Sequence, residues 1–129
     1  MNLLLDAHCL VWFRIGNSCL STVVREAMES DQNRLVVSIA SFWELSIKES
    51  LGRFRCEGGV DGIYREWIQD GVAELLPIEW RHLSILGDLP WIHRDPFDRL
   101  LVAQARREDL TLATNDQNIH RYPELKTIW

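Results

Sequence analysis

The chain has 129 residues, 47% of them hydrophobic and 26% charged, a composition that excludes a disordered or fibrous protein and predicts one globular domain over residues 1–129. Its formal net charge of −5 argues against broad, nonspecific electrostatic binding to DNA, because domains of that kind are strongly basic. The spacings of the three cysteines match no zinc module and no redox pair, so we expect reduced thiols in a cytoplasmic protein. The sequence has no basic leader and no long apolar stretch, which predicts neither secretion nor a membrane span.

The first third of the chain predicts two strands and two helices. Residues 3–5 form a short, unalternating apolar run, as expected of a strand that is buried on both faces. A short helix is expected over 8–14, ended by a turn at Gly16, and Ser21 can cap a second helix. The β-branched run 34–39 predicts the second strand.

The middle of the chain predicts two helices and a third strand. The first helix is expected to begin at about Ser41 and to end at Gly52, because glycine suits the left-handed conformation that follows a helix end. The second helix carries Ile63 and Trp67 on one face. The apolar run 72–76 then predicts the third strand.

The last third of the chain contains its clearest helix, 97–108, which has a wide apolar stripe after the start signal Asp95-Pro96. The other elements expected here are a short helix at 79–86, a strand at 110–113, a further helix beginning at Asn115 and an edge strand at 127–129. Strands that alternate with helices predict an α/β fold with three layers, α/β/α, around a central, mostly parallel sheet of about five strands.

Four acids recur where an apolar run ends or a helix begins: Asp6, Glu44, Asp98 and Asp116. The carboxyl ends of parallel strands open on one edge of a sheet, where α/β folds bind their ligands. We therefore expect these four carboxylates, which are far apart in the sequence, to converge in space.

Each acid also has a local structural interpretation. Asp6 can cap the helix that follows it, and Ser41 with Glu44 has the S-x-x-E form of a capping box. Glu44 can instead pair with Lys48 one turn later, and Asp98 is a first-turn acid that the helix dipole favours. The functional interpretation depends on the conjunction of the four acids.

Several carboxylates in one crevice repel one another unless a cation lies between them. The hard cations Mg²⁺ and Mn²⁺ take oxygen ligands and can supply a bound water for phosphodiester hydrolysis. The histidines have no metal-ligand spacing: His8 could contact a ligand carboxylate, and His82, His93 and His120 are expected at the surface or in packing. The sequence has neither a glycine-rich phosphate loop nor a serine-nucleophile motif.

Motifs around these acids occur in a fixed order: LLLDAH at 3–8, SFWELSIK at 41–48 followed by Gly52-Arg53, HRDPFDRLLVAQA at 93–105, and LATND at 112–116. In this combination the whole chain resembles PIN-domain proteins, and most closely the VapC-type toxins of bacterial toxin–antitoxin pairs. The resemblance implies an endoribonuclease that uses Mg²⁺ or Mn²⁺ to cleave RNA with water.

The resemblance also implies roles for individual residues. Asp6 and Asp98 would bind the metal directly, Glu44 would bind it or orient the water, and Asp116 would complete the site. Asp95 is expected to be a helix cap and not a ligand. Further candidates are Thr114, as a hydrogen-bond partner of a ligand carboxylate, and Lys48, Arg53 and Arg99, as contacts for RNA.

The partners implied by the resemblance are the RNA substrate, a cognate antitoxin protein and a second copy of the chain in a homodimer. The six tryptophans agree with this, because tryptophan is enriched at protein interfaces, although most of them could also lie in the core. An inhibitory segment could place a basic side chain among the carboxylates.

Three alternative functions remain open on the sequence. The first is a noncatalytic PIN-like module that binds RNA or protein, since Ala7 stands where the family usually has a hydroxyl residue. The second is a housekeeping RNA-processing nuclease. The third, a Mg²⁺-binding receiver or a phosphatase, is disfavoured because Asp6 has no neighbouring acid in a D-x-D pair.

Overall fold

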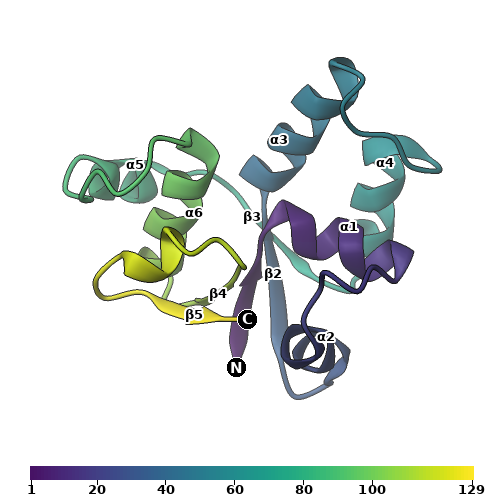
Figure 1. The fold of residues 1–129 in the computed structure, drawn as a ribbon, viewed down its shortest axis with the longest axis horizontal. Coiled ribbons are helices and arrows are strands. Elements are labelled where there is room, and N and C mark those ends of the chain that lie inside the picture. Colours follow the sequence, from purple (N-terminus) through teal and green to yellow (C-terminus); the bar gives the residue numbers. More distant parts are fainter.

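The computed structural model describes residues 1–129 and has a five-stranded parallel sheet at its centre, with strand order β3-β2-β1-β4-β5 (Figure 1). The strands are β1 (Asn2–Leu5), β2 (Arg34–Ser38), β3 (Glu74–Leu76), β4 (Thr111–Ala113) and β5 (Lys126–Ile128). The predicted α/β architecture with about five parallel strands is confirmed, and the expected edge strand is β5.

Helices cover both faces of this sheet, which Figure 1 shows nearly edge-on. One side carries α1 (Ala7–Ile15), α2 (Thr22–Glu29), α3 (Ile39–Ser50) and α4 (Gly59–Tyr64), which continues into the π-helical turn η1 (Arg65–Gln69). The other side carries α5 (Trp80–Leu86) and α6 (Pro96–Arg107). No helix combines the length and the apolar character needed to cross a bilayer.

Alternate residues of β1 enter two separate cores. Leu3 and Leu5 pack with residues of α1, α2 and α3, whereas Leu4 packs with residues of α6 and β4 on the opposite face. All three leucines are fully buried, because β1 is the central strand and is covered on both sides. This explains why the strand has an unalternating apolar sequence.

The order of the strands places a topological switch point between β1 and β4. From β1 the chain first proceeds outward through β2 to β3, and it then returns to the other side of β1 to form β4 and β5. Leu5 and Ala113, the last residues of β1 and β4, are paired neighbours. Asp6 and Thr114 therefore emerge side by side at the edge of the sheet where parallel α/β folds bind ligands.

One helix start differs from the sequence-based prediction. Helix α3 begins at Ile39 and not at Ser41, because it follows β2 without a loop and the Ser38 hydroxyl accepts a hydrogen bond from the Ala40 N–H at 3.1 Å. Ser41 lies inside the helix, and its buried hydroxyl has no hydrogen-bond partner. The predicted capping box between Ser41 and Glu44 is therefore wrong.

The helix predicted to begin at Asn115 is also wrong. Only a short 3-10 turn, η2 (Ile119–Arg121), forms in this region. Before this turn, side-chain oxygens accept the backbone N–H groups that a helix would otherwise use. The Asn118 N–H donates to Asp116 Oδ1 at 2.8 Å, and the Asp116 N–H donates to Thr114 Oγ1 at 3.2 Å. Local bonds of this kind compete with helix formation.

The two serines at the start of α3 allow a paired test of this boundary. Ser38→Ala removes the observed cap and is expected to lower the free energy of unfolding by about 1 kcal/mol. Ser41→Ala removes a buried hydroxyl without a partner, so stability should stay the same or rise. Urea unfolding of both variants measures the difference, and an equal loss in both would contradict the assigned boundary.

Candidate functional site

Asp6 occupies the junction between β1 and α1. Its carboxylate is buried, and Oδ1 accepts a hydrogen bond from the Cys9 N–H at 2.9 Å, so the residue caps α1 as one of the sequence interpretations expected. This bond uses one carboxylate oxygen and fixes the direction of the other. Capping and cation binding are therefore compatible roles for Asp6.

Asp98 lies in the first turn of α6. Asp95 caps this helix, accepting hydrogen bonds from the Phe97 N–H at 2.9 Å and the Asp98 N–H at 3.0 Å, as predicted. Because Asp95 accepts the N–H groups at the start of the helix, the Asp98 carboxylate is not needed as a cap. It is 27% exposed, and its Oδ2 lies 3.5 Å from Nε2 of His93.

Glu44 lies in the second turn of α3, with only 16% of its side chain exposed. Its Oε2 is 3.8 Å from Nζ of Lys48, which is the predicted ion pair one turn later. Burial raises the pKa of Glu44, as do the charges of Asp95 and Asp6, whereas Lys48 and His8 oppose that rise. The charge of Glu44 is therefore influenced by Asp6 at the end of β1, by His8 in α1 and by Asp95 at the start of α6.

The strongest electrostatic signal is at Asp98. Burial and then the negative charges of Asp95, Glu44, Asp116 and Asp6 raise its pKa to about 7. The other three acids singled out in the sequence, Asp6, Glu44 and Asp116, thus lie close enough to Asp98 to act on its charge. Carboxylates gathered in this way favour a proton or a cation between them.

Asp116 belongs to the same cluster. Ligand atoms of His93, Asp98 and Asp116 lie within 4.8 Å of one another, a spacing at which one ion could contact all three residues. Thr114 is buried, and its hydroxyl accepts the Asp116 N–H instead of contacting a carboxylate. Its observed contact fixes the turn that presents Asp116.

His93 was expected at the surface or in packing, and it packs against Tyr122, but the sequence did not indicate that it would also lie beside Asp98. Nδ1 of His93 lies 2.8 Å from the hydroxyl of Tyr122, and the two rings meet edge to face at 5.4 Å. The position of His93 two residues before Asp95 in the HRDPFD motif was a signal. The contact itself requires η2 and the segment after it to fold back over α6, which the sequence pattern does not reveal.

Arg99 is a structural residue, which corrects its assignment to RNA binding. It is only 5% exposed, and its guanidinium donates to the carbonyl oxygens of Leu86, Leu89 and Pro90 at 2.9 to 3.4 Å. Its Cζ also lies 3.9 Å from the ring centroid of Trp91. These contacts hold the loop between α5 and α6 and leave Arg99 turned away from solvent.

The other basic candidates lie along or beyond α3. Lys48 is 38% exposed and pairs with Glu44, and Arg53 is exposed after the end of the helix. Lys48 thus lies beside Glu44, whereas Arg53 lies beyond the end of α3, after the turn at Gly52.

The donor set of the cluster fits Mg²⁺ or Mn²⁺. Carboxylate oxygens are hard ligands that both ions accept, and the cluster contains no thiolate ligand of the kind that zinc structural sites use. The nearest cysteine, Cys9, is buried, and burial followed by the charge of Asp6 raises the pKa of its thiol well above the usual value. The thiol is therefore protonated, and its Sγ donates to the carbonyl oxygen of Ala113 at 3.5 Å.

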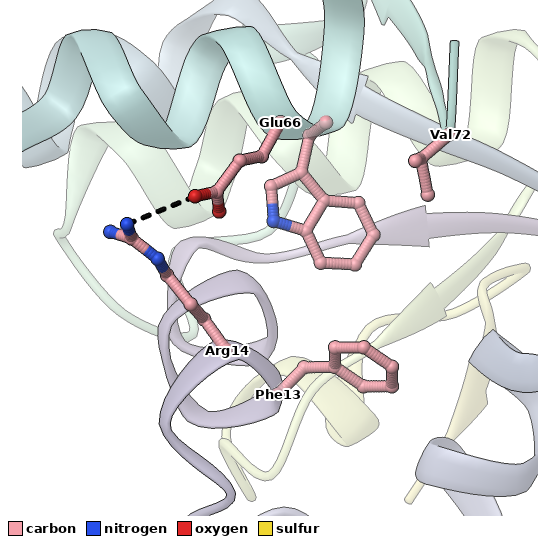
Figure 2. Close-up of a pocket in the computed structure, with 5 residues that line it drawn as sticks. Phe13, Arg14, Glu66 and Val72 are labelled. Carbon is pink, nitrogen blue, oxygen red and sulfur yellow. Dashed lines mark hydrogen bonds and ion pairs between the residues drawn. The ribbon is translucent and has the colours of Figure 1, made fainter. Parts of the chain in front are cut away.

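A separate pocket of about 240 Å³ lies between α1 and η1 (Figure 2). It is lined by Phe13, Arg14, Glu66, Trp67 and Val72. Arg14 donates to Glu66 at 3.0 Å, as the dashed line in Figure 2 marks, and this ion pair neutralises the polar side of the pocket. None of the four clustered acids lines it, so we assign no chemistry to this pocket.

The tryptophans divide between the core and the surface. Trp67 is buried, and Trp12 and Trp129 are half-buried and meet edge to face at 6.0 Å. Trp43, Trp80 and Trp91 are exposed, the last two at 77%. Trp43 directly precedes Glu44 and packs against Phe97, which directly precedes Asp98, so an aromatic pair borders the acid cluster.

Comparisons with known proteins agree with the fold and the motif order. Residues 3–125 match the sequence model of the PIN domain. The fold is similar to the solved structure of VapBC2 from Rickettsia felis bound to a DNA fragment from their promoter, with 16% identity, a TM-score of 0.73 and coverage of 100% of this chain and 99% of that chain.

Two further solved structures are similar over nearly their full length. They are DNA-bound VapBC from Salmonella typhimurium, with 18% identity, a TM-score of 0.71 and coverage of 99% of this chain and 97% of that chain, and FitAcB from Neisseria gonorrhoeae, with 13% identity, a TM-score of 0.67 and coverage of 98% and 96%. At these identities the likeness shows the fold. Curated protein sequences gave no significant match.

The raised pKa of Asp98 predicts a pH-dependent gain in stability for Asp98→Asn. The folded-state pKa of about 7 exceeds the usual unfolded value, so the native state holds the extra proton, and the contribution of Asp98 to stability is lost as pH rises from about 4 through 7. The full shift corresponds to about 4 kcal/mol, and partial exposure reduces the expected gain to roughly 2 kcal/mol at pH 8.

Urea unfolding in EDTA at pH 8, 6 and 4.5 measures this effect, and the advantage of Asp98→Asn should shrink as the pH falls. Asp31→Asn, in an exposed turn before β2, is the matched control and should show no such trend. If Asp98→Asn were no more stable than the unsubstituted protein at pH 8, the electrostatic account of the cluster would be wrong.

Proposed function

The chain belongs to the PIN domain family, and we propose that it is a metal-dependent endoribonuclease, the toxin of a toxin–antitoxin pair. The observation that carries this proposal is the setting of Asp98, whose pKa is raised to about 7 by burial and then by the negative charges of Asp95, Glu44, Asp116 and Asp6. A cluster of carboxylates without a cation lowers the stability of the protein. This cluster lies at the switch point of the sheet, which is where α/β proteins bind ligands.

Each acid has a defined part in the proposed reaction. Asp6 and Asp98 bind Mg²⁺ or Mn²⁺ directly, and Asp116 completes the site. When bound, the ion would activate water and neutralise charge on the phosphoryl group. Glu44 binds the ion or orients the water, and its partial burial and raised pKa suit it to accept a proton.

Neighbouring side chains support these roles. Thr114 holds the turn that presents Asp116, since its hydroxyl accepts the Asp116 N–H. Lys48, which is partly exposed beside Glu44, is suited to contact an RNA phosphate near the acids, and Arg53 is suited to contact one farther along the strand. Local cations matter here because the chain has a net charge of −5.

We propose a cognate antitoxin and a second copy of the chain as protein partners. Structures similar to this chain include VapBC and FitAcB assemblies, whose names identify them as complexes. The exposed rings of Trp43, Trp80 and Trp91 provide the kind of aromatic anchors that interfaces use. A basic side chain of an antitoxin could enter the acid cluster and inhibit the enzyme.

Three free cysteines agree with a reduced, cytoplasmic setting.

Cleavage of a mixed cellular RNA pool tests the proposed activity. The purified protein should cut RNA at discrete sites with Mn²⁺ or Mg²⁺ and should stop in EDTA. Asp6→Asn and Asp98→Asn should each reduce the rate at least about 100-fold, because each removes a proposed metal ligand.

Asp31→Asn serves again as the control and should retain full activity. Before the assay, size-exclusion chromatography under denaturing and refolding conditions removes any bound antitoxin, so that inhibition does not mask cleavage. Cleavage that persists in EDTA, or in both ligand variants, would contradict the assignment of the activity to this site.

A further inference from the structure

His93 presents an unpaired nitrogen to the acid cluster. Its side chain is 11% exposed, and Nε2 is completely buried without a hydrogen-bond partner. The group nearest to this nitrogen among the acids is Asp98, whose Oδ2 lies 3.5 Å away, just beyond a good hydrogen bond. A buried polar atom that lacks a partner is rare in proteins and requires an explanation.

The other ring nitrogen of His93 is firmly held. Nδ1 lies 2.8 Å from the hydroxyl oxygen of Tyr122, a residue that is only 4% exposed. The same hydroxyl oxygen accepts a hydrogen bond from Nη1 of Arg99 at 3.3 Å. Arg99 is itself fixed by backbone carbonyls of the loop before α6, so this arrangement has little freedom to change.

The hydrogen-bond inventory of these three side chains determines the tautomer of His93. A guanidinium can only donate, so the Tyr122 oxygen is an acceptor toward Arg99. The Tyr122 hydroxyl proton then has one acceptor within reach, Nδ1 of His93, because Tyr122 is buried and makes no other side-chain hydrogen bond. Neutral imidazole that accepts at Nδ1 carries its proton on Nε2.

We propose that His93 is a positioning residue, which acts through Asp98 by donating its Nε2–H to the Asp98 carboxylate. This inference rests on the nuclease function proposed above. A modest rotation of Asp98 would close the 3.5 Å gap, as happens when active-site hydrogen bonds tighten in the working state. The donated bond holds one carboxylate oxygen and leaves the other directed toward the cation.

The tautomer of His93 separates this residue from the metal ligands. A ring nitrogen of His93 lies within 4.8 Å of oxygens of Asp98 and Asp116, so distance alone would admit His93 as a ligand. Ligation requires a lone pair on Nε2, which would move the imidazole proton to Nδ1. The buried Tyr122 hydroxyl would then lose its only acceptor, so the Arg99–Tyr122–His93 arrangement disfavours that state.

Two substitutions of His93 distinguish a donor from a ligand or a space-filling side chain. His93→Leu removes the donor and is expected to weaken Mn²⁺ binding by roughly 10- to 100-fold, the range typical of groups that orient metal ligands. His93→Gln places an amide N–H close to the position of Nε2 and should recover most of the affinity. Isothermal titration calorimetry with Mn²⁺ measures both, and thermal unfolding in EDTA checks that each variant folds.

Nitrogen-15 NMR of the unsubstituted protein provides a test that needs no variant. The spectrum of His93 should show the neutral tautomer protonated at Nε2, both in EDTA and with saturating Mg²⁺. Tyr122→Phe removes the hydroxyl that fixes this state and should produce a mixture of tautomers.

The outcomes separate this inference from the proposed function. Equal Mn²⁺ affinity in His93→Leu and the unsubstituted protein, or a tautomer protonated at Nδ1, would overturn the role of His93 alone. Failure of His93→Gln to recover affinity would likewise overturn it, in favour of direct ligation. If the unsubstituted protein bound no Mn²⁺, the proposed metal site would fail, and the role of His93 would fail with it.

Discussion

Repulsion among carboxylates is the constraint on which the rest of this site depends. The parallel sheet brings Asp6 and Asp116 to one edge, and the starts of α3 and α6 add Glu44 and Asp98. Burial disfavours the charged form of Asp98, and the neighbouring negative charges add to this effect, so that the pKa of Asp98 rises to about 7. A bound cation would relieve this repulsion, so cation binding at the proposed nuclease site is expected to stabilise the protein.

The fold holds these charges in place with bonds that are independent of any ion. One oxygen of Asp6 caps α1, Asp95 caps α6 in place of Asp98, and Thr114 fixes the turn of Asp116. Asp6 and Asp116 are thereby held by their own segments of the chain and not by the other acids. A preorganised cluster of this kind does not have to be assembled when a ligand binds.

The sequence predicted much of this arrangement because strand and helix signals act locally. Buried strands appear as apolar runs, and the acids that follow them appear at the ends of those runs. Ser38 was missed as a cap because β2 passes directly into α3. The burial of Arg99 and the contact of His93 with Tyr122 were not predicted, because these contacts involve loops and segments far apart in the chain. Contacts between distant segments leave no periodic pattern in a sequence.

Crystallography with Mn²⁺ tests the central claim most directly. Anomalous scattering should give a peak at the carboxyl edge of the sheet, with oxygens of Asp6 and Asp98 at about 2.0 to 2.2 Å from it and with Nε2 of His93 turned toward Asp98 outside ligand distance. The account would be contradicted if no anomalous peak appeared at this edge at millimolar Mn²⁺, or if the Mn²⁺ ion bound elsewhere in the fold.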